Sequence, residues 1–203
     1  MTSATKPLNP KRFEDFIRHM TALVESLGDD EPALLDAAEP LLGDLIRSDD
    51  WLPERFARPS EQSYRQYLLY CDPMQRFSVL SFVWQPGQMT PVHDHTVWGL
   101  VGVMRGEERC EEYVATGGGR LPRKSGEHAL PCGAIDRVSP RIGDVHRVSN
   151  AGRGTAISIH VYGADIGTTT RHVFDESTGA VKDFVSGYNN GEQAPLLVAT
   201  KAR

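Results

Sequence analysis

The sequence predicts a mainly β protein, a small antiparallel sandwich or barrel preceded by a helical extension. Apolar residues recur at helical spacing early in the chain, whereas short runs rich in β-branched and aromatic residues alternate with turn residues from residue 64 onward. The chain has 203 residues, enough for one domain with a sizeable core. We expect residues 1–58 to form the helical extension, 59–185 the barrel and 186–203 a surface tail.

Two apolar stretches of helical periodicity are predicted to form the extension. Asn9 and Pro10 are a start signal, because Asn caps helices and proline is tolerated at the first helical position. Gly28 is a matching stop signal. The second stretch spans residues 32–47, and Pro40 is expected to divide it into two short helices. Neither stretch offers a candidate site, so we interpret both as a cap that packs on a sheet.

The strands predicted for the barrel are short and closely spaced. They cover residues 64–70, 76–84, 97–104, 108–114, 145–148 and 155–162. Residues 117–122, rich in glycine and ending in proline, are expected to form a loop. Many short strands between turns are typical of a sandwich or barrel.

Composition narrows the class of partner. The net charge is −5 and the chain has no basic cluster, so nucleic acid is not an expected partner. The first residues lack the apolar core of a secretion signal, and no run is long enough to span a membrane. We therefore expect a cytoplasmic protein without a membrane partner. Cys71, Cys110 and Cys132 show no C-x-x-C spacing and are interpreted as reduced thiols, not as a disulfide or zinc site.

His93 and His95 are the centre of the predicted chemistry. Residues two apart in an extended strand point to the same face, so both imidazoles can reach one metal ion. A third ligand is needed, and His146 offers one. Imidazole suits iron, copper, nickel or zinc, so the ligand type leaves the metal open. Asp94 points to the opposite face and is interpreted as a structural hydrogen-bonding residue.

A second set of polar residues alternates along the predicted strand 155–162. Ser158, His160 and Tyr162 share one face, and the residues between them are apolar. Three polar groups on an inner face are costly unless they bond to one another. We therefore expect His160 to bridge the two hydroxyls. From the residues alone, His160 as a fourth metal ligand is an equal alternative.

The segments around these histidines resemble the paired motifs of the cupin superfamily. The first motif, G-x5-H-x-H-x3-E-x6-G, is matched at Gly87, His93, His95 and Gly106. The second is matched at Gly143, His146 and Asn150. Gly99 stands where the first motif has Glu, so a carboxylate ligand is missing. The resemblance implies a small antiparallel jelly-roll barrel, which here would offer three neutral histidines to a metal.

Residues 60–175 also resemble the cysteine dioxygenase family of thiol dioxygenases, because they lack the carboxylate ligand and contain the Ser–His–Tyr strand. This resemblance implies a mononuclear non-haem Fe(II) ion held by His93, His95 and His146. The implied reaction adds both atoms of dioxygen to a small carboxylated thiol and gives a sulfinate.

The same resemblance implies a role for the polar strand. Ser158 and His160 would support Tyr162, whose hydroxyl approaches bound substrate or oxygen. Members of the mammalian type crosslink this tyrosine to a cysteine of the H-x-H strand. Gly99 takes the place of that cysteine, and Cys110 lies too far along the next strand, so no crosslink is expected.

Gln66 and Arg171 are the expected substrate-binding residues. Cysteine-selective members bind the substrate carboxylate with the arginine of a Tyr-x-Arg segment, which here is Tyr64-Arg65-Gln66. Gln66 would face the pocket and Arg65 would turn away. A glutamine here resembles the bacterial 3-mercaptopropionate dioxygenase branch, in which an arginine after the Ser–His–Tyr strand binds the carboxylate. Arg171 matches that position, with a solvated surface arginine as the alternative. The expected substrate is 3-mercaptopropionate, with L-cysteine second.

Two other functional classes stay open. One is another metal-dependent cupin enzyme, such as an isomerase or a dioxygenase that acts on ring carbon, against which the Ser–His–Tyr strand argues. The other is a non-enzymatic cupin that binds an effector, against which the lack of a DNA-binding motif argues. The remaining histidines are interpreted as exposed or structural: His19 on the polar side of the first helix, His128 in a loop and His172 without a clear partner.

Overall fold

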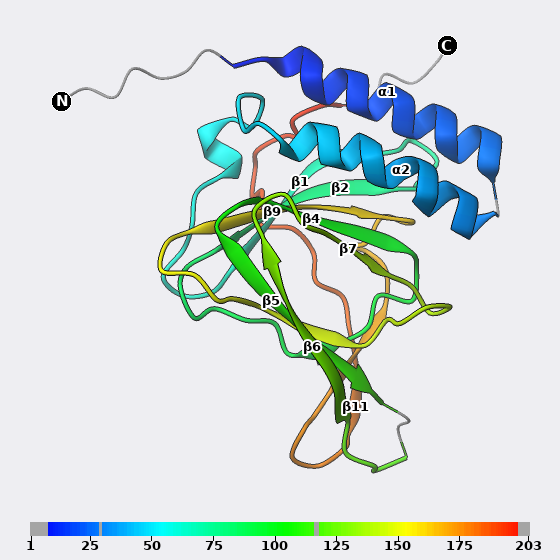
Figure 1. Ribbon diagram of the computed structural model, residues 1–203, viewed down its shortest axis with the longest axis vertical. Helices are drawn as coiled ribbons and strands as arrows, with labels where there is room; N and C mark the ends of the chain where they lie inside the picture. Colours follow the sequence, from blue (N-terminus) through cyan, green and yellow to red (C-terminus); the bar gives the residue numbers. More distant parts are fainter. Residues whose placement is uncertain (1–7, 29, 116–117, 199–203) are drawn as a thin grey trace.

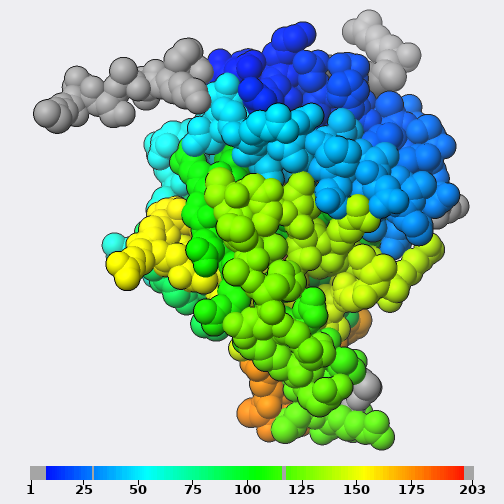
Figure 2. Space-filling model, in the orientation of Figure 1, coloured from blue at the N-terminus to red at the C-terminus, as the bar shows by residue number. Residues whose placement is uncertain are grey.

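The computed structural model describes residues 8–28, 30–115 and 118–198. Two N-terminal helices lie over a five-stranded antiparallel sheet, and a six-stranded antiparallel sheet completes the fold (Figure 1). In the space-filling view the helices, in blue and cyan, cover one end of the molecule above the green and yellow strands (Figure 2). The predicted fold class, mainly β with antiparallel sheets and N-terminal helices, is confirmed.

The helical layer follows the sequence prediction closely. α1 (Pro10–Leu27) buries one apolar stripe, which includes Phe13 and Met20. α2 (Glu31–Ile46) is continuous through Pro40, so the prediction of two short helices was wrong. Pro40 and Asp36 are both exposed, and water can therefore hydrate the Asp36 carbonyl that loses its N–H donor. A short 3-10 helix, η1 (Glu54–Phe56), connects this layer to the first strand.

The five-stranded sheet has the order β1-β2-β9-β4-β7. Its strands are β1 (Arg65–Cys71), β2 (Ser78–Trp84), β9 (Ala156–Tyr162), β4 (Gly99–Arg105) and β7 (Ile135–Val138). On β9, the residues Ile157, Ile159 and Val161 belong to the same buried apolar cluster as the helices. Because side chains alternate along a strand, the opposite face of β9 is turned toward the barrel interior.

The six-stranded sheet has the order β11-β10-β3-β8-β5-β6. Its strands are β11 (Val181–Phe184), β10 (Arg171–Phe174), β3 (Val92–His93), β8 (His146–Asn150), β5 (Glu107–Val114) and β6 (Arg123–Pro131). β5 and β6 form a long hairpin that runs away from the helices (Figure 1). His128 lies on β6, so the prediction of a loop at this position was wrong.

Residues 186–198 of the predicted C-terminal tail, 186–203, lie along β1, and residues 199–203 lie outside the described structure. The Asn189 side chain accepts a hydrogen bond from the Gln66 backbone N–H at 2.8 Å. Asn190 contacts Leu68 in the same way, at 2.7 Å. This segment therefore covers the edge of the five-stranded sheet, where β1 would otherwise present unpaired backbone groups. Among the described helices, none combines the length and apolarity that a membrane span requires.

Candidate metal centre

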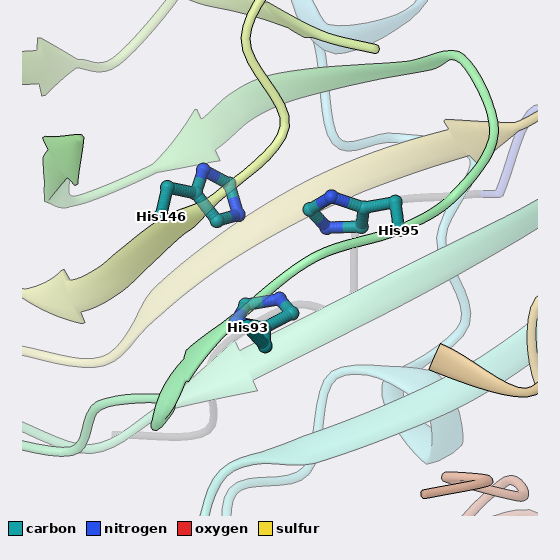
Figure 3. A group of neighbouring side chains, drawn as sticks. All are labelled: His93, His95 and His146. Atoms are coloured by element: carbon teal, nitrogen blue, oxygen red, sulfur yellow. The ribbon is translucent and has the colours of Figure 1, made fainter. Parts of the chain in front are cut away.

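Three buried imidazoles converge where the six-stranded sheet lines the barrel interior. His93 ends β3, His95 lies in the loop just after it, and His146 begins β8. His93 and His146 are register partners across the β3–β8 pair. One ring nitrogen from each histidine lies within 4.8 Å of the other two. Figure 3 shows the three rings turned toward one another. The structure thus brings together the three residues that the sequence predicted as ligands.

The Nδ1 atom of each ring has a partner of its own. These partners are the Pro91 carbonyl at 3.0 Å from His93, the Asp144 carboxylate at 2.9 Å from His95 and the Cys110 thiol at 3.5 Å from His146. An engaged Nδ1 leaves Nε2 as the ligand atom and fixes the orientation of the ring. In agreement, the Nε2 atom of His95 is buried and has no hydrogen-bond partner within the described chain.

The environment keeps these imidazoles uncharged. Burial, together with the neighbouring His95, lowers the pKa of His93 to about 3. Burial also lowers the pKa of His146 well below its ordinary value. Neutral imidazole is the form that binds metal ions. The donor set, its close approach and the open nitrogen of His95 therefore fit a bound metal ion, although three imidazoles do not select one metal.

Asp144 organises the loop that carries His95, and sequence reasoning missed this role. Its Oδ1 accepts the backbone N–H of His95 at 3.0 Å, and its Oδ2 accepts that of Thr96 at 2.9 Å. Burial alone would raise the pKa of Asp144, but the hydrogen bonds from His95 and Thr96 hold it below its ordinary value. Thr96 has φ = 62°, an unfavourable backbone for a β-branched residue. Asp144 therefore stabilises a strained turn next to the candidate ligand His95.

No family model matches this chain. Solved structures that are similar to it include a conserved protein with a double-stranded β-helix domain from Klebsiella pneumoniae, at 22% identity and TM-score 0.44, over 56% of this chain and 89% of that one. A Cupin 2 conserved barrel domain protein from Salinispora arenicola is 18% identical, with TM-score 0.40, over 56% and 86%. An oxalate oxidase in complex with the substrate analogue glycolate is 17% identical, with TM-score 0.41, over 52% and 53%.

A hydrogen-bonded chain of three side chains runs along the inner face of β9. Ser158 Oγ lies 2.8 Å from His160 Nε2, and His160 Nδ1 lies 2.8 Å from the Tyr162 hydroxyl. The bridge expected from the sequence is therefore present, and both nitrogens of His160 are used in it. This leaves His160 outside the cluster of candidate ligands. The Phe82 ring stacks on His160 with 4.0 Å between the ring centroids, which fixes the imidazole from the side.

Tyr162 connects this chain to the candidate metal ligands. Its ring stacks on His95 with 5.1 Å between centroids and 18° between planes. Gly99 is the register partner of Tyr162 on β4, and the tyrosine ring occupies the space that a side chain at residue 99 would need. Burial raises the pKa of Tyr162 well above its ordinary value, so its hydroxyl keeps its proton.

A narrow cavity of about 30 Å³ borders His93, His146 and Tyr162. Its wall also includes Gln66 and Arg171, which the sequence predicted as substrate-binding residues. The remaining lining residues are Tyr64, Phe82, Trp84, Thr90, Pro91, Val148, His160, Phe184 and Ser186. The site residues predicted from two distant parts of the sequence thus share one small cavity.

Arg171 is buried, with 5% of its surface exposed, so the alternative of a solvated arginine was wrong. It donates a hydrogen bond to Ser186 Oγ at 2.6 Å, and its guanidinium lies 4.5 Å from the Phe184 ring centroid. Its Nε is buried without a partner in the described structure. Gln66 faces the same cavity and donates from Nε2 to the Gly187 carbonyl. Arg65 turns away and bonds Ser60.

Asp94 and His172 form a pair on the outside of the ligand strand. Asp94 accepts the backbone N–H and the Nδ1 of His172, both at 2.7 Å. The structural role expected for Asp94 is present, and His172 has the partner that the sequence did not reveal. The pair connects β10, which begins with Arg171, to the segment just after His93.

A second group of ligand-type side chains, Cys110, His128 and Asp136, lies behind His146. His128 Nε2 bonds the Asp136 carboxylate at 3.0 Å. Because Cys110 contacts His146 on one side and this group on the other, the group supports the orientation of a candidate ligand. Cys110 lies on β5, and its thiol lies 3.5 Å from His146 Nδ1.

Proposed function

We propose that this protein is an Fe(II)-dependent thiol dioxygenase that converts a small carboxylated thiol into its sulfinate. The observation that carries the proposal is the narrow cavity bordered by His93, His146, Tyr162 and Arg171. Three requirements of the reaction meet in it: imidazole ligands without a carboxylate, a hydroxyl at the end of a hydrogen-bonded chain, and a buried cation.

The neutral ligand set supports an anionic substrate. His93, His95 and His146 add no negative charge to a bound divalent ion, and Gly99 supplies no carboxylate. His93, His95 and His146 would hold Fe(II), and the chemistry that this ion would supply is electron transfer between a thiolate and dioxygen. The overall step, RS⁻ + O₂ → RSO₂⁻, keeps both oxygen atoms and neither takes up nor releases a proton. The protein therefore has to orient reactants and balance charge, and it needs no external reductant.

Arg171 is suited to bind the carboxylate of the substrate. A planar guanidinium can donate two parallel hydrogen bonds to a carboxylate. The contacts with Phe184 and Ser186 fix its plane, and its unpartnered Nε keeps a donor available. Because a buried cation without a counter-ion is costly, a carboxylate at this place would be strongly favoured. The Gln66 amide, on the same wall, adds a neutral polar contact.

Tyr162 supplies a hydroxyl to the cavity from a ring that stacks on His95. Its chain to His160 and Ser158 fixes the position of this hydroxyl before substrate binds. Donors that are positioned in advance stabilise developing negative charge without reorganising during the reaction. We assign Tyr162 the role of donating a hydrogen bond to the oxygen atoms that are transferred to sulfur.

The cavity favours 3-mercaptopropionate over L-cysteine. L-Cysteine carries an ammonium group next to its carboxylate, and this group needs an anion or several acceptors. Within the described structure, the side chains of the cavity wall include no carboxylate. An ammonium group would also lie near the positive charge of Arg171. We therefore propose 3-mercaptopropionate as the leading substrate, with L-cysteine second.

The test is oxygen uptake by the Fe(II)-loaded protein with 3-mercaptopropionate, L-cysteine and cysteamine, with the sulfinate identified by mass. We expect the carboxylated thiols to react and 3-mercaptopropionate to have the highest kcat/KM. Arg171→Ala should lower kcat/KM for 3-mercaptopropionate by about 100-fold and for cysteamine, which lacks a carboxylate, by far less. Arg171→Lys should not restore it, since lysine lacks the planar fork.

The matched control is Arg65→Ala, which removes the same charge from a side chain that turns away from the cavity. It should leave all three values unchanged. Gln66→Arg should shift the preference toward L-cysteine by adding the arginine of the cysteine-selective branch. Full iron binding without oxygen uptake for any thiol would reject the proposal and favour a different metal-dependent reaction or effector binding.

A further inference from the structure

Glu108 is the buried glutamate of the described chain, and the chemistry above leaves it without a role. It lies on β5 with no measurable exposure, and neither carboxylate oxygen makes a hydrogen bond of ordinary geometry. The Ser158 hydroxyl and the Trp84 indole N–H lie on the side of its carboxyl, and both act to lower its pKa against the effect of burial. An unpartnered carboxylate is among the most costly groups to bury, so a proton on this carboxyl is the simplest way to remove the cost.

The contact with Ser158 places Glu108 at the inner end of the hydrogen-bonded chain. Ser158 Oγ accepts a hydrogen bond from Trp84 Nε1 at 3.3 Å and lies 2.8 Å from His160 Nε2. A hydroxyl has one proton to donate. Ser158 can therefore donate toward His160 or toward Glu108, but not toward both.

The group to which Ser158 donates determines the direction of the other hydrogen bonds in the chain. If Ser158 donates to His160 Nε2, the ring proton of His160 sits on Nδ1 and is donated to the Tyr162 oxygen. The Tyr162 proton is then free for a ligand in the cavity. If Ser158 donates to Glu108, His160 carries its proton on Nε2, and Nδ1 accepts the proton of Tyr162. In that state the tyrosine hydroxyl donates away from the cavity.

We propose that Glu108 is a positioning residue that sets the direction of the Ser158–His160–Tyr162 hydrogen bonds, so that only its protonated form leaves the Tyr162 hydroxyl free to donate into the cavity. A neutral Glu108 donates to Ser158, so that each hydrogen bond of the chain is donated toward Tyr162 and the tyrosine proton points into the cavity. An ionised Glu108 accepts from Ser158, so that each hydrogen bond is donated toward Glu108 and the tyrosine proton points to His160. The consequence for turnover rests on the function proposed above, whereas the protonation state itself does not.

The surroundings of Glu108 support a protonated acid near neutral pH. Burial raises the pKa of Glu108 to about 7, against the opposing contacts with Ser158 and Trp84. The titratable groups that interact electrostatically with Glu108 are Tyr162 on β9 and Cys110 on the same strand as Glu108. His160 lies on the far side of Ser158. The residues opposite it on the neighbouring strands, Asn150 on β8 and Leu130 on β6, carry no charge.

The first test measures protonation directly and needs no turnover. Infrared spectra of the whole protein between about pH 5 and about pH 9 should contain a carboxylic acid C=O band that disappears with a midpoint near pH 7. Labelling glutamate with ¹³C should shift this band in the wild-type protein, and Glu108→Gln should remove it. Glu107→Gln, which changes the exposed residue next to it on β5, should leave the band in place. A wild-type protein without a glutamic acid band across this range overturns the proposal.

The second test uses the pH dependence of kcat. The wild type should lose turnover about tenfold per pH unit above its midpoint. Glu108→Gln can donate from its amide at every pH, so its kcat should stay within about twofold over the same range. An unchanged alkaline limb in Glu108→Gln overturns the proposed direction of the chain. If no thiol is oxidised by the wild type, the function fails, and the infrared band still decides whether Glu108 holds a proton.

Discussion

Replacing Gly99 by alanine tests how the Tyr162 ring is held in place. A Cβ atom at residue 99 would lie 2.6 Å from Tyr162 Cδ1, 2.8 Å from Cε1 and 2.9 Å from Val138 Cγ2. Ordinary contacts of a Cβ atom begin at 3.4 Å. The tyrosine ring would therefore have to move by about 0.8 Å, because tightly packed interiors leave no room for overlap.

A displacement of this size would break the inner chain. A displacement along this bond would lengthen the 2.8 Å separation between the Tyr162 hydroxyl and His160 Nδ1 to about 3.6 Å, outside hydrogen-bonding range. Overpacking typically costs about 1–3 kcal/mol, and a lost buried hydrogen bond adds about 1 kcal/mol. We expect Gly99→Ala to lower the free energy of unfolding by about 2–4 kcal/mol and the melting temperature by roughly 5–15 °C. Turnover of 3-mercaptopropionate should fall by at least tenfold.

Gly102→Ala is the matched control on the same strand. Its Cβ atom would lie 3.0 Å from Ile46 Cδ1 and 3.1 Å from Leu42 Cδ2, the flexible ends of two α2 side chains on the far side of the sheet. The assays are urea denaturation and the rate of oxygen uptake for both variants. Gly102→Ala should lose little stability and keep its turnover. The reasoning is refuted if Gly99→Ala unfolds within about 0.5 kcal/mol of wild type and remains fully active.

Three further predictions follow from side chains around the site and from one distant ion pair. Asp144→Asn should weaken metal binding about 10–100-fold by loosening the orientation of His95, which titration with Fe(II) or Co(II) can measure. Tyr162→Phe should bind metal as wild type does and raise the reaction barrier by roughly 2–4 kcal/mol, seen as a fall in kcat. Burial alone would raise the pKa of Asp72, but hydrogen bonds from Arg76 hold this pKa below its ordinary value. The ionised Asp72 therefore stabilises the fold above about pH 4, and this contribution to stability is lost as the pH falls through the lowered pKa. Asp72→Asn should therefore cost about 2 kcal/mol at pH 7 and flatten the acid dependence of stability in denaturation curves; an unchanged dependence would contradict the assignment.

The ligand set could be predicted because its signal is local. Alternation places His93 and His95 on one side of an extended segment, and the spacing around His146 repeats a known motif. α1 could be predicted for the same reason, since both its apolar stripe and its end signals lie within the segment. Interactions between residues that are far apart in sequence have no local sequence pattern. The contact between Asp144 and His95 is of this kind, so it could be found only in the folded structure.

The prediction missed five strands: β3, β7 and β10 are too short to show a clear alternation, and β6 and β11 are largely exposed. β6 and β11 alternate little between apolar and polar residues, because most of their side chains face solvent. One missed signal was nevertheless present. Cys110 is buried on β5, so alternation already placed Glu108 on the same inward face. A charged residue at an inward position is the kind of local conflict that marks a functional site.

The order in which the chain is synthesised has a consequence for how the centre is completed. The three candidate ligands come from residues 93–146, whereas Arg171 and Ser186, on the wall of the cavity, come later in the chain. β3 can pair with β8 as soon as both have left the ribosome, before the last segment settles along β1. During that interval the imidazoles are open on the side that the wall later closes. A metal ion that fits these three imidazoles would have a wider entrance at that stage than the finished cavity of about 30 Å³ offers.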